Sequence, residues 1–133
     1  MKLTQKIVIF IVTLFAAMRI AGAAPAETPE EKITKFLWSA SGSTEQKTEL
    51  IYHDLKDNYN TRITFTRDKN FRRSDGVNGT WQFEGGKLVL TGLDTKDGFT
   101  IIFDASTLNE SQLTGHIPKG KWRGHKVLLK LSK

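Results

Sequence analysis

The chain has 133 residues, no cysteine and a formal net charge of +6 at pH 7, from 20 Lys and Arg against 14 Asp and Glu. Lys2, Lys6 and Arg19 belong to an N-terminal segment of different composition, and without them the balance is 17 to 14, a net of +3. So small a charge argues against a nucleic-acid-binding protein. Without cysteine there are no disulfides and no lipid-modified cysteine, so an apolar core must stabilise the fold.

Residues 1–26 have the layout of a secretory signal peptide. Two lysines precede a twelve-residue apolar run at 7–18, and the small-residue segment AGAAPA follows at 21–26. The run is shorter than the ~20 residues that a transmembrane helix needs. We therefore expect cleavage after Ala26 or Ala23, no stable membrane insertion afterwards, and a periplasmic or secreted protein. An uncleaved amphiphilic anchor is the alternative.

The remaining residues, 27–133, suit a single domain of 107 residues. They begin with Thr28, Pro29 and Glu31 at the positions of a helix N-cap, a first helical residue and a capping-box acid. This pattern predicts a helix of about two turns that ends near Leu37. A short helix in this position can close one end of a β-barrel.

Beyond this helix the pattern changes to short strands with turn residues every 8–12 positions, the spacing of an all-β sandwich or barrel. The expected strands span residues 37–42, 47–55, 60–67, 70–74, 78–84, 87–93, 98–104, 110–117 and 125–132. Their short connections favour a small antiparallel up-and-down barrel of eight or nine strands. Closure would pair the apolar last strand with the first and remove an edge prone to aggregation.

Residues 79–90 (GTWQFEGGKLVL) predict a hairpin, because apolar and polar residues alternate on both sides of a Gly-Gly turn. Together with Leu-Thr-Gly at 113–115, this segment resembles the G-x-W, L-x-L and L-x-G rhythm of bacterial lipocalin-like domains, which are small calycin-type barrels of exported proteins. The resemblance implies an eight-stranded barrel with an internal ligand site and no shared catalytic residues. The chain departs from the family because no glycine lies two positions ahead of Trp38.

The phases of the expected strands assign eighteen residues to the barrel interior. They are Trp38, Leu50, Tyr52, Ile63, Phe65, Phe71, Trp81, Phe83, Leu88, Leu90, Phe99, Ile101, Phe103, Leu113, Ile117, Val127, Leu129 and Leu131. Seven of them are Phe or Trp, which is enough aromatic volume to fill a barrel of this size completely. The alternative is a modest apolar pocket at one open end.

Two segments are rich in cations, residues 62–73 and residues 118–133. They predict a rim that recognises an anion, although charge balance against the acidic segment 27–57 explains much of the same pattern. Arg73 shares the inward phase of Phe71, and a buried unpaired arginine is costly. We therefore expect Arg73 to pair with an acid, a ligand anion or solvent at the barrel mouth.

The sequence offers no pattern for catalysis or for a metal. His53, His116 and His125 are too dispersed to predict a metal site, and no cofactor is expected. No nucleophile elbow, metalloprotease motif or phosphate-binding loop is present, so we do not expect an enzyme.

These observations predict an exported, non-catalytic, lipocalin-like protein that binds a small apolar or amphipathic ligand, an anionic one included, at one barrel mouth. The expected ligand-binding residues are Trp38, Tyr52, Arg73, Trp81, Phe99, Trp122 and Arg123. The alternative is a protein-interaction module with a solid core, such as an inhibitor, an envelope accessory or a secreted effector. That module would bind its partner with the basic aromatic loop at 119–125.

Overall fold

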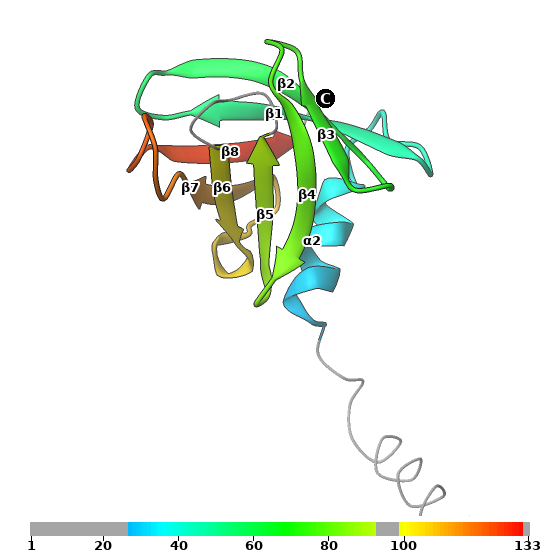
Figure 1. The fold of residues 1–133 in the computed structure, drawn as a ribbon. Coiled ribbons are helices and arrows are strands. Elements are labelled where there is room, and N and C mark those ends of the chain that lie inside the picture. Colours follow the sequence, from blue (N-terminus) through cyan, green and yellow to red (C-terminus); the bar gives the residue numbers. More distant parts are fainter. Residues whose placement is uncertain (1–26, 93–98, 132–133) are drawn as a thin grey trace, which may run out of the picture.

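A computed structural model describes residues 27–92 and 99–131, and Figure 1 shows their arrangement. Eight antiparallel strands form a closed barrel in sequence order, because β1 pairs with both β2 and β8. The elements are α2 (Pro29–Leu37), β1 (Lys47–Asp54), β2 (Tyr59–Thr66), β3 (Asn70–Arg73), β4 (Asn78–Glu84), β5 (Lys87–Gly92), β6 (Phe99–Asp104), the 3₁₀ turn η1 (Ala105–Thr107), β7 (Gln112–His116) and β8 (Lys126–Leu131). The predicted all-β up-and-down barrel is confirmed. The predicted signal segment lies outside the described residues.

The helix α2 begins as the sequence predicts. Thr28 Oγ1 accepts a hydrogen bond from the Glu31 N–H at 3.1 Å, and Glu31 Oε1 accepts one from the Thr28 N–H at 2.8 Å. The apolar face of α2, formed by Ile33, Phe36 and Leu37, is buried in the core of the barrel. Because α2 packs against β5 and η1, it closes one end of the barrel.

The strand expected at residues 37–42 is wrong. The helix continues to Leu37, and Trp38 caps it by donating its backbone N–H to the Thr34 carbonyl at 3.1 Å. The physical reason is the spacing of Ile33, Phe36 and Leu37, which places three apolar side chains on one helical face. Burial of that face outweighs the strand propensity of the aromatic residues.

The expected interior residues form the core. They are buried apart from Trp38, Phe83 and Leu131, which are partly buried and pack against the others. The central hairpin has the predicted register, since Trp81 pairs with Leu90 across β4 and β5. The core of the barrel is therefore closely packed with apolar side chains, as the aromatic content predicts.

The connections of an up-and-down barrel alternate between its two ends. Those at 67–69, 85–86 and 105–111 share the end that α2 covers. The turns at 55–58 and 74–77 and the loop at 117–125 lie at the opposite end, which we call the open end. Within the described part of the chain, no helix is long and apolar enough to cross a membrane.

Candidate functional site

A pocket of about 270 Å³ lies at the open end of the barrel. Its lining comes from β1, β2, β3, β6 and the open-end connections and consists of Tyr52, Asp54, Asp57, Tyr59, Arg73, Asp75, Val77, Phe99, Ile117 and Trp122. The pocket lies at one end of the barrel, in agreement with the alternative of a modest pocket at an open end. Its lining is more polar than the expected apolar pocket, because three carboxylates and a guanidinium join the aromatic rings.

Arg73 is buried in the wall of this pocket, as its strand phase predicts. Its Nε donates to Asp75 Oδ1 at 3.1 Å and its Nη2 donates to Asp75 Oδ2. The guanidinium lies over the ring of Tyr52, 4.5 Å from the centroid, and 5.6 Å from that of Phe99. The expected pairing of Arg73 with an acid is confirmed, and the aromatic faces add cation–π attraction.

The same contacts set the ionisation of the pocket wall. Burial raises the pKa of Asp75, but the hydrogen bonds and charge of Arg73, together with the Tyr59 hydroxyl that donates at 2.9 Å, outweigh it and lower that pKa. Burial raises the pKa of Tyr52 above its ordinary value of 10.0, with Arg73 opposing the shift in part. At neutral pH the wall therefore holds an ionised Asp75 beside an uncharged Tyr52.

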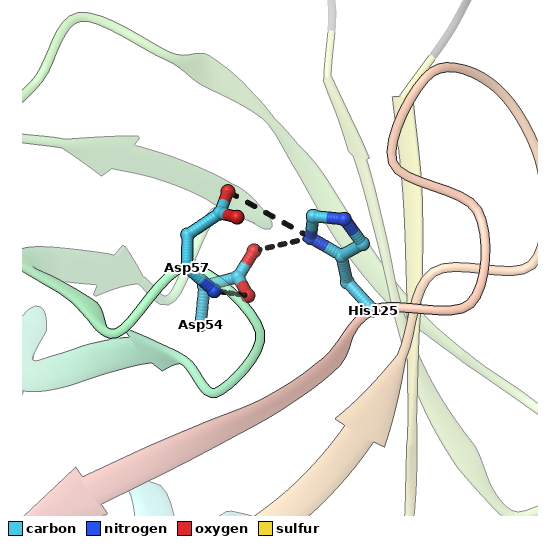
Figure 2. Close-up of side chains that lie close together, drawn as sticks. All are labelled: Asp54, Asp57 and His125. Atoms are coloured by element: carbon cyan, nitrogen blue, oxygen red, sulfur yellow. Dashed lines mark hydrogen bonds and ion pairs between the residues drawn. The ribbon is translucent and has the colours of Figure 1, made fainter.

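Asp54, which lines the pocket, meets His125 of the neighbouring connection, and Figure 2 shows the two side chains with that of Asp57. Asp54 Oδ1 accepts the backbone N–H groups of Lys56 at 2.9 Å and Asp57 at 3.2 Å, and its Oδ2 lies 2.8 Å from His125 Nδ1. Asp57 Oδ2 lies 3.9 Å from the same ring nitrogen. Burial raises the pKa of Asp54, but the hydrogen bonds from His125 and the backbone outweigh it, so that pKa is lowered.

The structure brings four of the seven expected ligand-binding residues together in the pocket, namely Tyr52, Arg73, Phe99 and Trp122. The other three lie elsewhere. Trp38 and Trp81 pack ring against ring at 6.1 Å, and Arg67 lies 3.8 Å over the Trp38 ring. Arg123 is exposed and does not line the pocket. Contacts within the protein therefore explain the positions of Trp38 and Trp81 without a ligand.

The expected ligand-binding residues do not include seven residues of this region, namely Asp54, Asp57, Tyr59, Asp75, Val77, Ile117 and His125. The sequence assigns Ile117 to the barrel interior. The other six lie at strand ends or in connections, and the three carboxylates among them are usually interpreted as turn formers. One signal was available for Asp54 and His125. Both flank the strands that barrel closure must pair, at the end of β1 and directly before β8.

A comparison of the chain with models of known protein families, with curated proteins and with solved structures found no match. The structure itself therefore defines the class: a small closed barrel of eight antiparallel strands, a fold compatible with lipocalin-like domains and with a binding protein.

Proposed function

We propose that this chain is an exported, non-catalytic, lipocalin-like binding protein that holds a small amphipathic ligand in the open-end pocket. The observation that carries the proposal is the pocket lining, in which the rings of Tyr52, Phe99 and Trp122 face polar and charged groups. A pocket with apolar walls and a few convergent polar groups is typical of a small-molecule site. The secretory composition of residues 1–26 supports export to a periplasm or the exterior.

Trp122 gives the pocket a partly exposed aromatic wall. Its ring meets Phe99 edge to face at 5.9 Å, yet 37% of the residue is exposed. An exposed aromatic ring beside a buried one offers apolar surface that a ligand covers on binding. A volume of about 270 Å³ fits only a small ligand or one end of a longer one.

The charges of the lining favour a neutral or cationic polar head. Arg73 is the single cation among the lining residues that the structure describes, and Asp75 already neutralises it through two hydrogen bonds. Asp54 and Asp57 add two further carboxylates to the same lining. We therefore favour such a head over the anionic one that the basic loops suggest.

Three probes of different charge test the pocket: the neutral dye N-phenyl-1-naphthylamine, the anionic dye 8-anilinonaphthalene-1-sulfonate and the cation hexyltrimethylammonium. We expect saturable quenching of tryptophan fluorescence by the neutral dye, and displacement of that dye by the cation, which has no chromophore of its own. Trp122→Phe should remove most of the quenching, whereas the matched Trp38→Phe should retain it, because Trp38 lies outside the pocket. No saturable quenching by any probe, or equal quenching in the two variants, contradicts the proposal.

One observation supports the alternative of a protein-interaction module. Arg123 and Lys121 are exposed outside the pocket, and Lys121 Nζ lies 5.4 Å over the ring of Trp122. The double variant Lys121→Glu, Arg123→Glu separates the two functions. If the pocket is the functional site, this variant should bind the dyes as the parent chain does. If the loop binds a protein, this variant should lose the binding of that purified partner.

A further inference from the structure

Asp54, Asp57 and His125 bring three metal-ligating side chains to one point on the rim of the pocket (Figure 2). Their ligand atoms all lie within 4.8 Å of one another. The backbone fixes this arrangement across the closing seam of the barrel. The Leu55 N–H donates to the Lys126 carbonyl at 2.9 Å, which ties the turn that carries Asp57 to the residue after His125.

The hydrogen bond between Asp54 and His125 explains the positions of these two side chains without any ligand. The same bond does not account for Asp57, whose Oδ2 lies 3.9 Å from His125 Nδ1 and whose side chain is 55% exposed. A ring nitrogen carries at most one proton, and the ionised Asp54 accepts it at 2.8 Å. The second carboxylate therefore has no proton to share at this ring nitrogen, whereas a cation placed among the three groups could bind all of them.

We propose that these three residues bind a divalent transition-metal cation such as Zn²⁺ through His125 Nδ1 and one oxygen each from Asp54 and Asp57. The cation takes the place of the Nδ1 proton, which is released to solvent while the neutral ring keeps its proton on Nε2, and it replaces the hydrogen bond between Asp54 and His125. One imidazole and two carboxylates suit Zn²⁺, Mn²⁺ or Fe²⁺, whereas Ca²⁺ and Mg²⁺ prefer oxygen ligands alone. Two ligands about 2.1 Å from one cation lie about 3.0–3.4 Å apart. His125 Nδ1 lies 2.8 and 3.9 Å from the two carboxylate oxygens, which brackets that range, and all three ligand atoms lie within 4.8 Å of one another, so the exposed Asp57 has to move inward to complete the site.

The cation would adjoin the proposed ligand pocket, because Asp54 and Asp57 also line it. The preference for a neutral or cationic head belongs to the metal-free pocket; a bound cation would balance these two carboxylates and would let this side of the pocket accept an oxygen donor from an organic ligand instead. The metal site itself requires no organic ligand, so it is tested with the metal alone.

Isothermal titration of the untagged full chain with ZnCl₂ tests this site, and we expect one Zn²⁺ per chain. Asp57→Asn is the decisive variant, because it removes a ligand charge and keeps the hydrogen bond between Asp54 and His125. It should weaken Zn²⁺ binding at least about ten-fold. The matched control is Glu110→Gln, an exposed acid in the connection 105–111 at the covered end, and it should leave the affinity unchanged.

His125→Ala should abolish Zn²⁺ binding, with His116→Ala, an exposed histidine of β7, as its control. Far-UV circular dichroism verifies that each variant folds, and Asp57→Asn decides the question if His125→Ala does not. The proposal is overturned if no stoichiometric Zn²⁺ binding occurs, or if Asp57→Asn binds as tightly as the parent chain. Zn²⁺ binding without dye binding would support the metal site and contradict the proposed function. Dye binding without Zn²⁺ binding would support the proposed function and contradict the metal site.

Discussion

Burial and charge conflict most directly at Arg73. Its side chain is only 9% exposed. Asp75, two positions further along the chain, and the ring of Tyr52 offset the free-energy cost of burying its charge. Strand alternation after Phe71 is enough to predict that Arg73 points inward. The identity of its partner depends on the bend at Gly76, where φ is 102°, and no alternation pattern encodes that bend.

Replacement of Asp75 by asparagine should destabilise the protein in a pH-dependent way. The pKa of Asp75 lies below its ordinary value of 3.8 in the folded state, so its carboxylate stabilises the fold above pH 3.8 and loses this effect as the pH falls through the lowered pKa. Asp75→Asn should lower the free energy of unfolding by about 1–3 kcal/mol at neutral pH, because Arg73 loses its charged acceptor. Urea unfolding at neutral pH and at about pH 3 should show this difference shrinking in acid. A constant difference would exclude the ion pair as its cause.

The contact of His125, unlike the inward orientation of Arg73, could not be predicted from strand alternation. Its contact with Asp54 joins positions 71 residues apart in the sequence, and it forms only because β1 and β8 pair in one particular register. The sequence predicts that these strands pair but leaves their register open, and a shift of one residue would turn the side chains to other faces. The sequence therefore places Asp54 and His125 near the closing seam of the barrel but does not predict that they meet.

Most strands could be predicted because each has one buried and one exposed face. The observed bounds of β4, Asn78–Glu84, coincide with the predicted ones. The expected strand at 110–117 begins later, at Gln112, since Asn109 Oδ1 accepts the N–H groups of Ser111 and Gln112 at 3.0 Å each. Such local side-chain turns compete with strand pairing and limit how well boundaries can be predicted.

The pairing of β4 with its neighbours depends on Gly79, the glycine of the G-x-W segment. A Cβ at this position would lie 2.0 Å from the Thr91 carbonyl oxygen and 2.7 Å from Cε2 of Phe71. Gly79→Ala should therefore force the strands apart and destabilise the fold by about 3 kcal/mol or more. Gly42→Ala is the matched control, since nothing lies within 4 Å of its added Cβ. Equal urea midpoints for the two variants would contradict this explanation of the motif.

At the scale of the whole molecule, the closed barrel could be predicted and the pocket could be predicted only in outline. The expected strands carry no helical segment among them, and the apolar β8 needs a partner, so closure follows from the sequence. The lining of the mouth depends on contacts between connections, such as that of Trp122 with Phe99. Strand periodicity does not specify such contacts.

Closure should make the barrel unfold as one cooperative unit, and Leu129 tests this. Leu129 is fully buried in β8 and pairs with Tyr52 of β1 and Leu113 of β7, so it lies at the closing seam. Leu129→Ala should cost about 2–5 kcal/mol of unfolding free energy, because it leaves a cavity there. Tryptophan fluorescence, to which Trp38, Trp81 and Trp122 all contribute, and far-UV circular dichroism should shift together in urea. Leu55→Ala, at a 47% exposed position, should leave both transitions in place. Two separate transitions in Leu129→Ala would mean that the seam opens while the remaining strands stay folded.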